Sequence, residues 1–147
     1  MLLADVTGKA SSCMHDLEHA RLMLRLAKDD LTALEVMESS PRISLGVFGF
    51  HVQQAVEKAL KAWLSLLGVA YPRPHVLYAL FALLEAHGAV TISGFGHLQS
   101  LTPFGVQFRY EAYANFDEPL DRSEVIRHVH ALLTHVETLI RETEQEA

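Results

Sequence analysis

The stretch FHVQQAVEKALKA, residues Phe50–Ala62, decides the fold of this chain because its apolar side chains repeat with the period of an α-helix. We expect this helix to run from Ile43 to Leu67, with Gly68 as its C-terminal cap. At about 100° per residue, one side of it collects an apolar face. The members of that face are Val52, Val56, Ala59, Trp63, Leu66 and Leu67.

The opposite side of the same helix carries a narrow polar stripe, made of His51, Gln54, Lys58, Lys61 and Ser65. Two lysines one turn apart beside an amide suit a phosphate group. The stripe is equally typical of the solvated back of an amphipathic helix, on which Glu57 and Lys61 form an i,i+4 ion pair. Both interpretations are open on the sequence alone.

The helical period continues upstream and downstream of this segment, and no stretch alternates as a strand does. A first helix is expected from Cys13 to Ser39, with Asp29, Asp30 and Glu38 off its apolar stripe. That stripe comprises Leu17, Ala20, Leu24, Ala27, Leu31 and Leu34. A third helix, His75–His87, is apolar nearly all round, which predicts that it is central or covered by a second subunit.

The C-terminal half is helical with interruptions. Turn signals occupy Gly88–Gly96, and a helical pattern over His97–Asn115 is broken at Pro103. Asp121 and Glu124 form a capping box for a last helix. The apolar seam of that helix is Val125, Val129, Leu132, Val136 and Leu139. We therefore predict an all-α fold, an up-and-down antiparallel bundle of about four to five helices, with flexible ends at about residues 1–12 and 142–147.

Length and composition bound the function. The 147 residues, 50% of them hydrophobic, predict a single domain over residues 1–147. One cysteine, no apolar run of membrane-spanning length and no signal-like start lead us to expect a cytoplasmic protein that does not enter a membrane. The net charge of −6 excludes a global basic field, so any nucleic-acid contact must come from a local cluster of cations.

The helix at Phe50–Ala62 closely resembles the signature helix of HEPN domains, a family named for nucleotide binding in higher eukaryotes and prokaryotes. The resemblance extends to Pro72–Leu77 and to the pair Arg109-Tyr110, and it covers roughly His15–Glu142. It implies a helical bundle that is commonly a homodimer and is often encoded beside, or fused to, a small nucleotidyltransferase. In some members the helical protein is a ribonuclease toxin and the nucleotidyltransferase is its antitoxin.

The toxin members carry an arginine, then a polar residue, then a histidine a few residues after the arginine. After Arg109, Ala114 takes the expected histidine position and Asn115 lies beside it. Asparagine can hold a phosphate but cannot exchange protons. We therefore expect a non-catalytic or weakly active binding protein, without cofactor or metal, whose ligand is nucleotide or RNA phosphate. The candidate binding residues are His51, Gln54, Lys58, Lys61, Arg109, Tyr110 and Asn115.

Other interpretations are open. Arg122 and His128 form a second arginine-to-histidine pair, which is the alternative catalytic pair of a ribonuclease toxin. A further alternative is a non-catalytic dimerisation module. Arg109 pairs with a carboxylate such as Glu57 if it has no ligand. His15 and His19 share a helical face, but without a third ligand we interpret them as surface histidines and not as a metal site.

Overall fold

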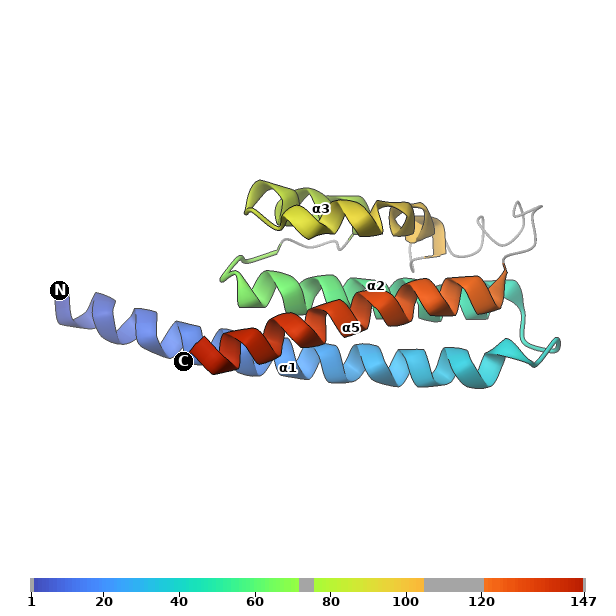
Figure 1. Ribbon diagram of the computed structural model, residues 1–147, viewed down its shortest axis with the longest axis horizontal. Helices are drawn as coiled ribbons and strands as arrows, with labels where there is room; N and C mark the ends of the chain where they lie inside the picture. The colour runs from blue at the N-terminus through green and yellow to red at the C-terminus, as the bar shows by residue number, and fades with distance from the viewer. Residues whose placement is uncertain (1, 72–75, 105–120, 147) are drawn as a thin grey trace.

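Helices account for the regular structure of the chain (Figure 1). The structure, a computed structural model, describes residues 2–71, 76–104 and 121–146, and within these ranges the side chains of all but residues 2–15 and 101–104. In these ranges there is no strand, and the all-α prediction is confirmed. The elements are α1 (Leu2–Glu38), α2 (Leu45–Leu66), α3 (Leu77–Ala86), the 3₁₀ helix η1 (Val90–Phe104) and α5 (Arg122–Glu146).

The helix ends follow capping rules visible in the sequence. The Ser44 hydroxyl accepts a hydrogen bond from the Val47 N–H at 3.2 Å and caps the start of α2. Gly68 ends that helix with a φ of +70°, which confirms it as the cap, because this left-handed conformation is costly for residues with a Cβ. Asp121 caps α5 by accepting from the Glu124 N–H at 3.1 Å, as predicted.

Two predicted boundaries are wrong. The first helix begins at Leu2 rather than at Cys13. The turn expected at Gly88–Gly96 and the described part of the helix expected from His97 instead form η1, whose buried residues Ile92 and Leu98 anchor it. The remainder of that predicted helix lies outside the described residues.

Three long helices make the body of the bundle. Figure 1 shows α1 antiparallel to both α2 and α5, which run in the same direction as each other. Helix α2 contacts α1, α5, α3 and η1, whereas α3 and η1 lie on the side of α2 away from α1 (Figure 1). Helix α2, which contains the stretch Phe50–Ala62, is therefore the central helix of the bundle.

The core confirms most of the predicted apolar faces. On α1, the stripe is buried from Ala20 to Leu34, and on α5 the seam is buried at Val129, Leu132 and Val136. On α2 the apolar face is buried from Val52 to Trp63, but Leu67 at its end is 41% exposed. Burial of these side chains supplies the main driving force for the fold.

Helix α3 does not occupy the centre, so that alternative is wrong. It buries one face, formed by Leu77, Leu80, Phe81 and Leu84, and leaves Tyr78 61% exposed. A shorter helix with one covered face is what a peripheral element requires. Its cover by a second subunit stays a prediction.

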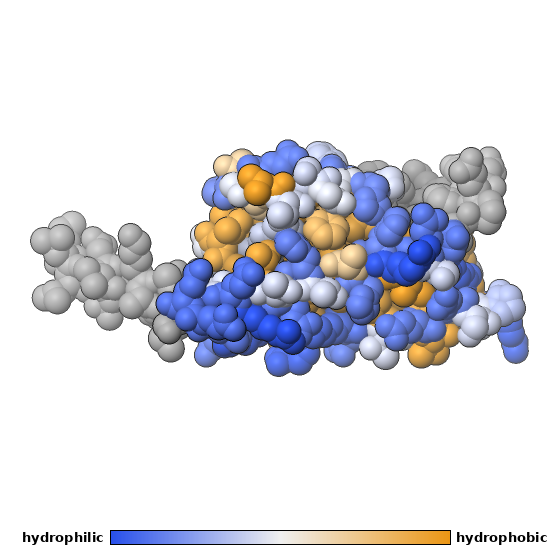
Figure 2. Space-filling model, viewed as in Figure 1, coloured by the Kyte–Doolittle hydropathy of each residue, from blue (hydrophilic) through white to orange (hydrophobic). Residues whose placement is uncertain are grey.

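The surface is unevenly polar. Figure 2 shows hydrophilic residues gathered over α1 and α5, and apolar residues visible between α5 and α3. Among the described helices, none combines the length and the apolar character needed to cross a membrane.

Candidate functional site

The polar residues of α2 are more enclosed than an amphipathic helix predicts. Gln53 is 3% exposed, Glu57 is 7% exposed and Ser65 is 5% exposed, although all lie on a helix with an extensive apolar face. The division into one dry face and one solvated stripe is therefore only partly correct. A buried polar group without a partner is costly, so each of these residues needs a hydrogen bond.

Asp30 of α1 organises the first half of the stripe. Its carboxylate is 12% exposed and accepts from the Lys58 Nζ at 2.6 Å through Oδ2. Its other oxygen, Oδ1, lies 3.1 Å from the His51 Nδ1. One carboxylate thus joins two positions two helical turns apart on α2, and clamps α1 to α2.

A second group forms around Glu57. The Lys61 Nζ lies 3.3 Å from the Glu57 Oε1, which confirms the predicted i,i+4 pair. Gln54 donates to the Gln53 Oε1 at 2.8 Å and to the Glu57 Oε2 at 3.3 Å. The two lysines are therefore each matched by a carboxylate, Lys58 by Asp30 and Lys61 by Glu57.

The loop after α2 covers one end of this cluster. The Lys61 ammonium lies 5.4 Å from the centre of the Tyr71 ring, within reach of a cation–π contact. The Tyr71 hydroxyl is 2.8 Å from the His19 Nε2. His19 is thereby engaged in the fold, and no group of three metal-binding side chains occurs among the described residues, while the His15 side chain lies outside them.

The structure brings together His51, Lys58, Gln54 and Lys61 as paired polar residues of α2. Arg109, Tyr110 and Asn115 lie outside the described residues, so their relation to α2 stays a prediction. Asp30 was predicted to lie off the apolar stripe of the first helix and was given no role, whereas the structure shows its side chain 12% exposed and paired with Lys58. The signal was available, because Asp30 follows Ala27 by three positions and precedes Leu34 by four, on the edge of the buried stripe.

Arg122 has a structural task in this geometry. Its Nη1 donates to the carbonyl oxygens of Met37, at 2.9 Å, and Ser40, at 3.1 Å, and its Nη2 donates to that of Ile43. The guanidinium also lies 5.1 Å from the centre of the Phe48 ring. The start of α5 is thus fastened to the connection between α1 and α2, and these donors are not directed at a ligand.

His128, the proposed catalytic partner of Arg122, faces η1 instead. Its ring meets the His97 ring edge to face, with centroids 4.4 Å apart. Burial and the neighbouring His128 lower the pKa of His97, and Glu124 opposes them. One further histidine of α5, His135, holds η1 through its contact with the Thr91 hydroxyl at 2.9 Å. His128 and His135, which are two helical turns apart on α5, therefore both contact η1 through their imidazole rings.

The comparison with known families decides the relationship. A model of the HEPN domain matches residues 20–139. The chain belongs to the HEPN domain family. The matched residues include all of α2 and α3 and part of α1 and α5, so the resemblance of the signature helix is confirmed. Comparisons with curated proteins and with solved structures returned no match.

The Asp30 clamp of this HEPN domain predicts a local stability difference. Asp30→Asn should lower the free energy of unfolding by about 1–3 kcal/mol, because it leaves the enclosed Lys58 ammonium without its anion. Asp29→Asn is the matched control, since Asp29 is exposed and has no partner among the described residues. Urea denaturation followed by circular dichroism measures both variants. Equal stabilities of the two variants would contradict the clamp.

The Arg122 contacts predict that a positive charge without the guanidinium shape does not maintain stability at position 122. Arg122→Lys should lose about 1.5–3 kcal/mol of stability, because a lysine ammonium cannot reproduce the fork that serves several carbonyls. Arg127→Lys, at an exposed position of the same helix, should leave stability unchanged. Thermal unfolding of both variants tests this difference, and an unaltered Arg122→Lys protein would exclude the structural role.

The His97–His128 contact predicts acid sensitivity. The lowered pKa of His97 means that the unfolded chain binds its proton more readily than the folded one. The stabilising contribution is complete above the ordinary pKa of 6.5 and is lost as the pH falls from there through the lowered folded pKa. His128→Gln should therefore reduce the stability lost between neutral pH and about pH 5. His130→Gln, an exposed control, should not, and a loss equal to wild type in His128→Gln would refute the coupling.

Proposed function

We propose that this HEPN protein is a cytoplasmic homodimer that binds the phosphate groups of a nucleotide or of RNA, and that it works with a small nucleotidyltransferase, in the manner of a toxin–antitoxin pair. The observation that carries the proposal is the family match, which includes the α2 face on which Lys58 and Lys61 are held in place. An ammonium group has three donors, and each lysine is paired with a single carboxylate, while Lys61 also lies against the Tyr71 ring. Donors therefore remain for a phosphate.

Charge decides what else the site needs. Lys58 with Asp30 and Lys61 with Glu57 are two neutral pairs, so the described part of the face has no excess positive charge. A phosphate requires such an excess to offset its desolvation. Arg109 would supply that excess charge, and Tyr110 and Asn115, from the same stretch of the sequence, would supply a stacking group and a hydrogen-bonding group.

Binding without cleavage is the form of the proposal that the described contacts favour. The guanidinium of Arg122 is engaged by backbone carbonyls, and His128 is engaged by His97. Both side chains are thus held by contacts within the fold, whereas cleavage needs an acid and a base placed on either side of the phosphate.

Equilibrium titration of the full chain with ATP and with a short RNA tests the proposal. We expect saturable binding. Arg109→Ala should weaken it about tenfold or more, because one or two charge-assisted hydrogen bonds are lost. Lys58→Ala should weaken it as well, provided that circular dichroism shows the variant folded. Arg127→Ala, an exposed arginine of α5, serves as the control for general charge loss.

The outcomes separate the alternatives. Absence of saturable binding, or binding indifferent to both Arg109→Ala and Lys58→Ala, would overturn the phosphate site. Growth arrest on expression in a bacterial host, relieved by Arg122→Ala or His128→Ala, would instead identify a ribonuclease. A dimer that binds neither ATP nor RNA would support the alternative of a non-catalytic dimerisation module.

A further inference from the structure

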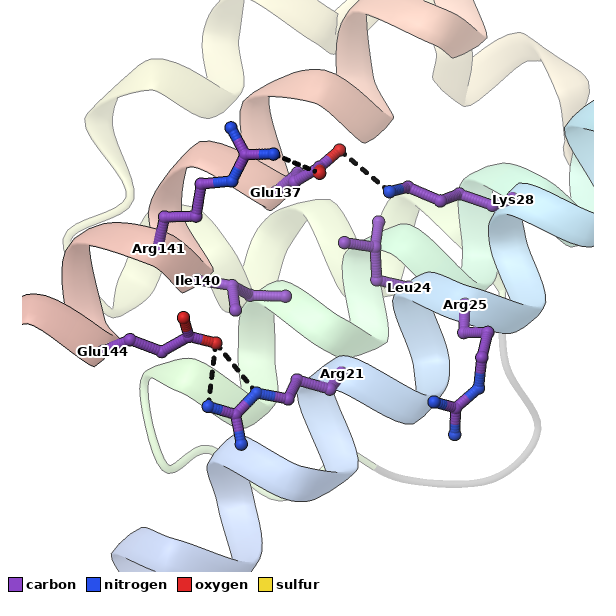
Figure 3. A pocket seen from close by; sticks show the side chains of 8 residues that line it. All are labelled: Arg21, Leu24, Arg25, Lys28, Glu137, Ile140, Arg141 and Glu144. Carbon is purple, nitrogen blue, oxygen red and sulfur yellow. Dashed lines mark hydrogen bonds and ion pairs between the residues drawn. The ribbon is translucent and has the colours of Figure 1, made fainter.

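A second group of charges lines a pocket of about 340 Å³ between α1 and α5 (Figure 3). Its wall holds four cations and two carboxylates, namely Arg21, Arg25, Lys28, Arg141, Glu137 and Glu144. Its floor is apolar, because Leu24 is 6% exposed and Ile140 is 4% exposed. None of these residues belongs to the polar face of α2.

The charges follow a matched register on the two antiparallel helices. Arg21 pairs with Glu144 at 2.8 Å, and Lys28 pairs with Glu137 at 2.9 Å. These two cross-links are at the two ends of the pocket. In the sequence, Arg25 falls between the two paired cations of α1 and Arg141 falls between the two paired carboxylates of α5, and Figure 3 shows their guanidinium groups on opposite sides of the pocket.

The charges of Arg25 and Arg141 are not fully neutralised by the protein. Arg141 turns along its own helix to Glu137, at 2.8 Å, and shares that carboxylate with Lys28. Arg25 is exposed and makes no ion pair or hydrogen bond among the described residues, and Figure 3 shows its guanidinium directed away from both ion pairs. Four cations against two carboxylates leave an excess of two positive charges in the pocket of a chain whose net charge is −6. On α1, Arg25 lies four positions after Arg21 and three before Lys28, and like charges at these spacings destabilise a helix.

We propose that this pocket is a second binding site, for a small phosphate monoester that carries an apolar or aromatic organic part. A doubly charged phosphate matches the excess charge, and it would relieve the repulsion of Arg25 by Arg21 and Lys28 on α1. Guanidinium groups are suited to it because their planar fork donates two parallel hydrogen bonds to phosphate oxygens. The organic part would rest on Leu24 and Ile140, and the volume is at the lower end of the range for small-molecule sites.

The site goes beyond the proposed function because it uses another face of α1. Arg21, Arg25 and Lys28 recur at spacings of four and three and face α5, whereas Asp30 contacts Lys58 and His51 of α2. Binding in the pocket therefore does not require Lys58, Lys61 or Arg109. The two sites fail or succeed independently.

Calorimetric titration of the full chain with phenyl phosphate, in a buffer free of phosphate and sulfate at low salt, tests the proposal. Inorganic phosphate and phenol are titrated in parallel, since they carry the two halves of the probe. We expect saturable binding of phenyl phosphate, weaker binding of inorganic phosphate, and no binding of phenol. Binding that depends on Arg25 of α1 distinguishes this site from the α2 face.

Charge reversal at Arg25 should weaken ligand binding without lowering the stability of the fold. Arg25→Glu should weaken phenyl phosphate binding about tenfold or more, because a guanidinium donor is replaced by a repelling carboxylate. The same variant should unfold at a temperature equal to or higher than the wild type, because the new carboxylate lies one helical turn from Arg21 and from Lys28 on α1. Arg42→Glu, an exposed loop position with the same change of charge, should alter neither measurement.

Three results would overturn the site. These are no saturable binding of phenyl phosphate to the wild type, unchanged binding in Arg25→Glu, or equal weakening in Arg42→Glu. Arg25→Gln, which removes the charge without adding a carboxylate, repeats the binding test if the reversed variant does not fold. Inorganic phosphate that binds as tightly as phenyl phosphate would refute the role of Leu24 and Ile140.

Discussion

The enclosure of α2 is the constraint on which the rest of the structure depends. This helix contacts α1, α3, η1 and α5, and even its polar residues Gln53 and Glu57 are almost fully buried. A central helix of this kind cannot leave a polar group unpaired, since the lost hydration is not replaced. The ion pairs of Lys58 with Asp30 and of Lys61 with Glu57 follow from that requirement.

The same requirement limits what α2 can bind. Pairing fixes the lysine side chains and so lowers the entropy cost of meeting a ligand, but it also cancels their charge. A phosphate at this face therefore depends on a third cation, which is why Arg109 has the decisive place in the proposed site.

The sequence predicted the parts of the fold that are periodic or locally capped. The seams of α1 and α5, the end of α2 at Gly68 and the cap at Asp121 all depend on near neighbours, which the sequence displays. The Glu57–Lys61 pair was predictable for the same reason. Asp30 with Lys58, and Arg122 with the loop before α2, join residues 28 or more positions apart, and such pairings depend on how the helices are placed. The pocket between α1 and α5 was not predicted, because its charged residues lie on two helices that are far apart in the sequence.

The two groups of charges differ in exposure, and this difference sets their chemistry. Inside the bundle, excess charge is too costly, so cations and carboxylates match one to one. Between α1 and α5 the side chains are hydrated, Arg141 being 68% exposed, and an excess of cations is tolerated. At physiological salt the Debye length is about 8 Å, so a small anion in that pocket is governed by the local cations. A long polyanion would extend over a surface whose net charge is negative, and the field there favours compact phosphate ligands over extended RNA.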